Sequence, residues 1–87
     1  IEVRREQGIV LKSGQELNLT KTEYRLVCEF ADHANMVLSR DQLLERVWDE
    51  QTDPMSNVVR VTVMTLRRRL GTPPVVETVV GAGYRIP

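Results

Sequence analysis

Two helix-start signatures in the middle of the chain limit the folds that are open to it. Thr20 is followed three residues later by Glu23, and Ser39 is followed at the same spacing by Gln42. Each pair can form a capping box, in which two side chains satisfy free backbone N–H groups at a helix start. Apolar residues at helical spacing follow both signatures. The sequence therefore predicts helices that begin at these two caps and end near residues 33 and 49.

The segments that flank these helices have the pattern of β-structure. Residues 1–19 hold short β-like runs around a Ser13-Gly14 turn, with Leu17 and Leu19 at alternate positions of the last run. Residues 75–86 hold two further β-like runs around a Gly-Ala-Gly turn. The sequence therefore predicts a small antiparallel sheet before the helices and a hairpin after them.

A third helix is predicted between two helix-breaking segments. Residues 50–55 are polar and contain a proline, and two prolines follow Gly71, a residue suited to a left-handed helix end. Residues 57–70 contain neither glycine nor proline, and Ser56 can cap their first turn. The complete order predicts an α+β fold with three helices between a small sheet and a hairpin.

The length and the cysteine content bound the organisation of the protein. The chain has 87 residues, which is too short for two domains, so we interpret residues 1–87 as a single domain. Cys28 is the only cysteine, which favours a reducing cytoplasm over secretion. No apolar run approaches the ~18 residues of a membrane span. Because the chain opens at Ile1 in strand-like sequence, we expect it to be a piece of a longer protein with an N-terminal partner domain.

Charge is divided unevenly along the chain, although the formal net charge is zero. Residues 1–53 hold seven basic and eleven acidic side chains, a net charge of −4. Residues 54–87 hold five arginines and one glutamate, a net charge of +4. This asymmetry is typical of proteins that bind a polyanion, and a set of solvated surface arginines explains the charge alone equally well.

The reactive side chains argue against catalysis and metal binding. His33 has no neighbouring nucleophile pattern, and one histidine with one cysteine cannot complete a zinc site. Asp49, Glu50 and Asp53 lack the glycine and the spacing of a calcium loop. The hairpin glycines join two strands, so they do not form a phosphate-binding turn before a helix. We therefore expect no enzyme activity, no metal ion and no cofactor.

The third predicted helix has two chemically different faces. At about 100° per residue, Val59, Val63, Leu66 and Leu70 form one apolar stripe that would face the core. On the opposite face, amide and guanidinium groups can form bidentate hydrogen bonds with bases, methyl groups can pack on thymine, and arginines at the edges can meet phosphates. That opposite face comprises Asn57, Val61, Met64 and Arg68, flanked by Val58, Arg60 and Thr65.

The apolar members of the outward face leave two functions open. The wheel places Val58, Val61 and Met64 away from the core, and exposure to solvent alone does not explain three such residues. They either approach DNA bases or form a strip that packs on another protein. The second alternative would make the domain a protein-protein interaction module.

Four ordered segments together resemble the C-terminal effector domain of OmpR/PhoB-type two-component response regulators. Residues 19–26 are similar to the first helix of that family, residues 38–48 to its second, residues 56–70 to its recognition helix and residues 77–85 to its wing. The resemblance implies a winged helix-turn-helix fold. It also implies a bacterial, sequence-specific DNA-binding output domain that regulates transcription at the end of a phosphorelay.

The resemblance further implies a mode of binding and a set of partners. The third helix, at about residues 57–70, would enter the major groove of double-stranded DNA, and hairpin 75–86 would be the wing. Loop 49–55 would face RNA polymerase, and a phosphorylatable receiver domain would precede the chain. We expect dimers on direct-repeat promoter sites, a mostly monomeric isolated domain, a cytoplasmic location and no membrane contact.

The helical wheel and the resemblance together assign the candidate residues. Phe30, Trp48, Val63 and Leu66 are assigned to the core. The base-facing group comprises Asn57, Val61, Met64, Thr65 and Arg68. The group expected at phosphates or along the groove comprises Arg40, Arg60, Thr62, Arg67, Arg69, Thr78, Tyr84 and Arg85.

The sequence departs from the family pattern at four of the positions that matter for DNA contacts. Arg60 stands where the family often has an aspartate, and Thr62 where it often has a histidine or a similar group. Thr65 replaces an arginine that often reads bases, and Val80 replaces the wing arginine that often enters the minor groove. The target DNA sequence therefore does not follow from the resemblance.

Overall fold

The computed structural model describes residues 1–49, 51–72 and 74–87. Glu50, in the predicted loop, and Pro73, in the predicted helix stop, lie outside the described residues. The elements of the described residues are, in order, β1 (Glu2–Arg4), β2 (Ile9–Lys12), β3 (Gln15–Glu16), α1 (Lys21–Asp32), α2 (Arg40–Val47), α3 (Val58–Leu70), β4 (Glu77–Val79) and β5 (Gly83–Arg85).

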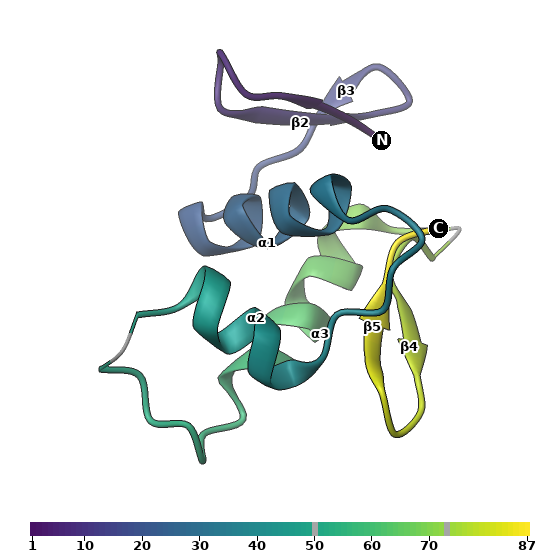
Figure 1. Ribbon diagram of the computed structural model, residues 1–87. Coiled ribbons are helices and arrows are strands. Elements are labelled where there is room, and N and C mark those ends of the chain that lie inside the picture. The colour runs from purple at the N-terminus through teal and green to yellow at the C-terminus, as the bar shows by residue number, and fades with distance from the viewer. Residues whose placement is uncertain (50, 73) are drawn as a thin grey trace.

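The elements form two small antiparallel sheets around a group of helices. Strands β1, β2 and β3 pair in chain order, and β4 pairs with β5. Figure 1 shows the first sheet above α1, with α2 and α3 below it and the β4–β5 hairpin beside α3. The predicted α+β fold and its order of elements are confirmed.

Both predicted capping boxes form as the sequence indicated. The Thr20 hydroxyl accepts a hydrogen bond from the Glu23 backbone N–H at 3.2 Å, and the Glu23 carboxylate accepts one from the Thr20 N–H at 2.8 Å. Ser39 and Gln42 make the same reciprocal pair at 3.1 and 2.9 Å. Each cap stabilises its helix start by about 1 kcal/mol. These caps fix where α1 and α2 begin.

The core lies between the three helices, the first sheet and the base of the hairpin. Phe30, Val63 and Leu66 are buried, as predicted, but Trp48 is only half-buried and packs against the edge of the core. Burial of each large aliphatic or aromatic side chain contributes about 1.5–3 kcal/mol. The full set of buried apolar residues is Val10, Leu26, Val27, Phe30, Leu38, Leu43, Val47, Val59, Val63, Leu66, Leu70 and Val76.

Three element boundaries differ from the sequence prediction. Strand β3 ends at Glu16, before the alternating leucines, because the chain leaves the sheet there to reach the α1 cap, although the Leu17 N–H still bonds the Val10 carbonyl at 2.8 Å. Helix α2 ends at Val47 because Trp48 has an extended backbone. Helix α3 takes Asn57 as its N-cap, and the expected cap Ser56 accepts only a long 3.4 Å hydrogen bond from the Val58 N–H.

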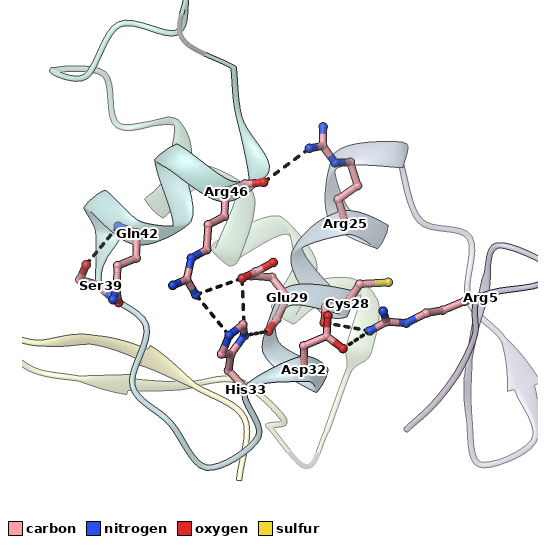
Figure 2. Close-up of polar contacts among 9 residues, drawn as sticks. All are labelled: Arg5, Arg25, Cys28, Glu29, Asp32, His33, Ser39, Gln42 and Arg46. Atoms are coloured by element: carbon pink, nitrogen blue, oxygen red, sulfur yellow. Dashed lines mark hydrogen bonds and ion pairs between the residues drawn. The ribbon is translucent and has the colours of Figure 1, made fainter.

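Polar contacts hold α1 against α2. The Arg46 guanidinium lies 3.1 Å from the Glu29 carboxylate and 3.4 Å from His33 Nε2, and His33 Nδ1 lies 3.0 Å from the Glu29 carbonyl oxygen (Figure 2). On the other side of α1, Arg5 bonds Asp32, and this hydrogen bond raises the pKa of Arg5. These side chains link α1 to α2 and to the turn after β1, and none of them belongs to the outward face of α3.

Candidate nucleic-acid interface

Helix α3 is divided into an inward and an outward face, as its sequence predicts. Val59, Val63, Leu66 and Leu70 are at most 2% exposed. On the opposite face, Val61 is 47% exposed and Met64 is 45% exposed. The same helix thus packs on the core with one stripe and presents apolar groups to the surroundings with the other.

The prediction that Val58 belongs to this outward strip is wrong. Val58 is half-buried and packs against the core, because it lies in the first turn of α3, where the helix side faces the body of the domain. The expected strip of three apolar residues is therefore a pair, Val61 and Met64.

The three consecutive arginines at the end of α3 have three different environments. The Arg67 Nε donates to the Val76 carbonyl oxygen at 3.1 Å, and its Nη2 donates to the Thr78 hydroxyl. The Arg67 guanidinium also lies 5.8 Å from the centre of the Tyr84 ring. Arg67 therefore joins α3 to the hairpin.

Arg69 is held by the body of the domain. Its Nε lies 2.9 Å from one carboxylate oxygen of Glu23, and its Nη1 donates to the Asn18 carbonyl oxygen at 3.1 Å. Glu23 is only 2% exposed, so the pair satisfies a carboxylate that would otherwise be buried without a counter-charge. The structure directs Arg69 toward α1 and the end of the first sheet.

Arg60 and Arg68 differ from these two arginines. Both side chains are exposed, and within residues 1–49, 51–72 and 74–87 neither has an ion pair or a side-chain hydrogen bond. They therefore flank Val61 and Met64 with two guanidinium groups that the described part of the chain does not engage.

The remaining polar residues of α3 contribute less to the outward face. The Thr65 hydroxyl donates to the Val61 carbonyl oxygen at 3.1 Å, within the helix, and Thr62 is half-buried. Asn57 is exposed, and its side chain makes no capping bond at the start of α3. Asn57 therefore has amide donors and an acceptor available for an external partner.

Arg40 connects the start of α2 to the loop before α3. Its guanidinium donates to the Pro54 carbonyl oxygen, to the Ser56 carbonyl oxygen at 2.8 Å, and to Asp41 at 3.1 Å. A hollow of about 510 Å³ lies beside it, and Asn57, Arg60 and Tyr84 contribute to its lining. The structure thus brings Arg40 near the predicted base-facing and wing residues.

The hairpin is anchored at its base and exposed at its tip. Leu38 and Tyr84 form an antiparallel bridge with N–H to O distances of 2.8 and 2.9 Å, which ties β5 to the segment before α2. Arg85 pairs with Glu77 across the two strands at 3.2 Å. Thr78 is exposed on β4, and Val80 at the tip is 93% exposed. Of the predicted wing residues, Arg85 already has a carboxylate partner.

Two further observations concern other classes of site. Within the described residues, no helix is long and apolar enough to cross a membrane. The same part of the chain contains no group of three or more histidine, cysteine or acidic side chains that could hold a metal ion.

Comparison with known proteins identifies the family to which this chain is related. Residues 14–86 match the family described as "Transcriptional regulatory protein, C terminal". The chain belongs to this family. The family consists of transcription regulators and is not an enzyme family. The predicted resemblance to OmpR/PhoB-type response regulators is confirmed.

Individual family members give the same result. The transcriptional regulatory protein CutR of Streptomyces coelicolor is 53% identical over 77 residues, which cover 88% of this chain and 36% of CutR. The chain therefore spans about a third of the length of that relative. The DNA-binding domain of Bacillus subtilis CssR is 32% identical, with a TM-score of 0.85 and coverage of 99% of this chain and 98% of that domain.

The Klebsiella pneumoniae RstA DNA-binding domain, solved in complex with the RstA box, is also similar. It is 27% identical, with a TM-score of 0.85 and coverage of 97% of this chain and 87% of that chain. These matches confirm the winged helix fold within the family.

Reasoning from the sequence missed the residues that hold α3 in place. Lys12 of β2 donates to the carbonyl oxygens of Leu70 and Thr72, at the end of α3. Glu23 was read only as a capping residue, although its carboxylate also pairs with Arg69. Both contacts join segments far apart in the chain, and a single sequence has no local pattern that indicates them. The one feature of the sequence that pointed toward such contacts was the excess of arginine in residues 54–87 over the acidic side chains there, against the acidic excess of residues 1–53.

Proposed function

We propose that this chain is a sequence-specific DNA-binding output domain that regulates transcription in a two-component system. Helix α3 enters the major groove, and the β4–β5 hairpin is a wing that reaches the neighbouring minor groove. The observation that carries the proposal is the outward face of α3, where two exposed apolar side chains lie between two arginines that the described residues leave without partners. The complex of the similar RstA domain with its DNA box supports this function.

The proposed base contacts come from the side chains that extend from α3 and are not needed within the domain. Asn57 and Arg68 offer bidentate hydrogen bonds, and Val61 and Met64 offer apolar contact to thymine methyl groups. Thr65 contributes its methyl group, because its hydroxyl bonds the Val61 carbonyl. Specificity in this proposal rests on two long polar groups and an apolar centre.

The proposed phosphate contacts come from the periphery of α3 and the hairpin. Arg60, Thr62, Thr78 and Tyr84 are exposed or half-buried around the outward face. Arg40 and Arg85 lie beside them but already bond Ser56 and Glu77, so they would contact phosphate with donors that remain. Arg69 is left out of the proposed contacts because Glu23 and Asn18 already engage it.

The partners of the whole protein are also part of this proposal. We propose that in the longer protein a phosphorylatable receiver domain precedes this domain and brings two copies together on direct-repeat sites. Loop 49–55, which precedes α3 in the sequence, would face RNA polymerase when the domain is bound. A cytoplasmic location follows from transcription control in a bacterial cell.

The experiment that tests the function is DNA binding by fluorescence anisotropy at several salt concentrations. We expect the domain to bind mixed-sequence duplex DNA with an affinity that falls steeply as salt rises, because phosphate contacts release counterions. Arg68→Ala should weaken binding to a duplex selected from a random library by about 1–3 kcal/mol.

The matched control is Arg4→Ala, which removes the same charge from the first sheet, where Arg4 pairs with Glu2. We expect this variant to bind DNA as the original domain does. Absence of salt-dependent binding at low salt would overturn the proposal and favour a protein partner for Val61 and Met64. An equal loss in both variants would assign Arg68 to general charge instead of base recognition.

A further inference from the structure

Arg67 makes the side-chain connection between the third helix and the hairpin. Among the residues that the structure describes, it is the only α3 side chain that hydrogen-bonds β4 or the segment leading into it. One donor reaches the main-chain oxygen of Val76, and another reaches the hydroxyl of Thr78, two residues further on. Arg67 is half-buried, and its bond to Val76 is partly shielded from water, whereas its bond to Thr78 is exposed.

The two partners of Arg67 require the shape of a guanidinium. Nε and Nη2 lie on one edge of a planar group, and they can serve two acceptors at once in fixed directions. The Cζ atom of the same group lies over the Tyr84 ring on β5, 5.8 Å from the ring centre and within the range of a cation–π contact. A lysine has the charge but not the planar fork, so it cannot reproduce this set of contacts.

The other side of the hairpin is fixed by a different contact. The bridge between Leu38 and Tyr84 ties β5 to the segment before α2. That bridge involves β5 and not β4. On the β4 side, Arg67 bonds Val76, just before the strand, and Thr78 within it. Arg67 is therefore a side-chain link from α3 to β4, in addition to the pairing of β4 with β5 and the burial of Val76 in the core.

We propose that Arg67 is a positioning residue, which sets the hairpin at the angle to α3 that lets both elements engage DNA together. This inference rests on the proposed DNA-binding function and assigns Arg67 a role other than a direct phosphate contact. It acts through Val76 and Thr78. A hairpin that is already oriented loses less conformational freedom on binding. Affinity therefore depends on this clamp, the bonds from Arg67 to Val76 and Thr78, although the Arg67 guanidinium itself touches no DNA.

A double-mutant cycle separates positioning from direct contact. Arg67→Lys keeps the positive charge and removes the two-pronged bond, and Thr78→Val removes the hydroxyl with little change in shape. The probe is a duplex selected from a random library by the unaltered domain. If Arg67 acts through Thr78, each single variant should lose about fivefold in affinity for this duplex. The double variant should lose no more affinity than the single variant that loses the most.

The control cycle pairs Arg68→Lys with Thr78→Val. Arg68 has no contact with the hairpin among the described residues, so these two losses should multiply. The inference would be overturned if the affinity losses of Arg67→Lys and Thr78→Val also multiplied in the double variant. That result would identify both residues as independent DNA contacts.

A second measurement needs no DNA. The ¹⁵N heteronuclear NOE of the backbone amides of residues 79–83 should fall in Arg67→Lys and in Thr78→Val, while the amides of α3 keep their values. Thr78 is exposed, so its variant keeps the measurement interpretable if Arg67→Lys unfolds. Unchanged hairpin amides in Thr78→Val would overturn positioning. If the unaltered domain selects no duplex, the proposed function fails, and the NOE still reports whether the clamp orders the hairpin.

Discussion

The outward face of α3 and the last turn of the same helix differ in what their charged side chains already contact. On the outward face, Arg60 and Arg68 extend from the domain without partners in the described residues. In the last turn, Arg67 bonds the hairpin and Arg69 pairs with a buried glutamate. Four arginines on one helix therefore form two groups, and this division differs from the one that the helical wheel predicted, in which only Arg68 was set apart.

The difference shows which arginines can approach a polyanion at low cost. A phosphate or a base that attracts Arg69 must compete with Glu23, and separating that pair would leave a carboxylate that is 2% exposed without a counter-charge. Arg60 and Arg68 lose only hydration and rotamer freedom. The helix thus combines arginines that are bonded within the domain and arginines that the described residues leave without partners, and each group can be altered separately.

The largest expected loss of stability comes from a substitution on the inward face of α3. It is the reference against which substitutions on the outward face are compared. Leu66→Ala should lower the free energy of unfolding by about 2–5 kcal/mol, because Leu66 is fully buried and its removal leaves a cavity. Urea denaturation followed by circular dichroism measures this loss. The control, Val61→Ala on the outward face, should stay within about 0.5 kcal/mol of the original domain. A comparable loss in both variants would contradict the division of α3 into two faces.

The next effect concerns the close approach between Gly83, the first residue of β5, and Leu38 in the segment before α2. A Cβ added at Gly83 would lie 2.1 Å from the Leu38 carbonyl oxygen, and Gly83 has a φ of 151°. Gly83→Ala should therefore destabilise the domain by about 1–3 kcal/mol and displace β5.

The control for Gly83 is Gly81, at the hairpin turn. Gly81 also has a positive φ, of 78°, but an added Cβ there meets no atom within 4 Å. Gly81→Ala should lower the thermal unfolding midpoint less than Gly83→Ala does. Equal shifts would mean that backbone conformation alone, and not the approach to Leu38, accounts for the glycine.

The smallest expected change in stability comes from a test that compares one arginine of each group directly. Arg69→Ala should lower the free energy of unfolding by about 1 kcal/mol, because it removes the partner of Glu23, while DNA affinity per folded molecule is unchanged. Arg68→Ala should do the reverse, with stability unchanged and affinity reduced. Chemical denaturation and anisotropy on the same two proteins measure both quantities. Interchanged results would show that the two arginines have been assigned to the wrong groups.

The local parts of this fold could be predicted from sequence because short-range chemistry determines them. Thr20 and Ser39 cap helices through side chains three residues away, and the helical period alone separates Leu66 from Met64. The glycine turn predicted the hairpin in the same way. In each case, the atoms that decide the structure are close together in the chain.

The parts that the sequence did not predict depend on contacts between distant segments. The half-burial of Trp48 and Val58 depends on how α2 and α3 meet the core, which no window of the sequence contains. The partners of Arg67 and Arg69 come from the hairpin and from α1. The helical wheel separated Arg68 from Arg67 and Arg69, but only the fold shows that Arg67 and Arg69 are already bonded within the domain.

The contact between Lys12 and the end of α3 bears on how small this domain can be made. The region by which the family is recognised begins at residue 14, after β2. A chain shortened to that region would lose the donor to the Leu70 and Thr72 carbonyls, together with the buried Val10 of the core. The segment that identifies the family is thus smaller than the set of residues that holds α3, and a minimal fragment must also keep β2, the central strand of the first sheet.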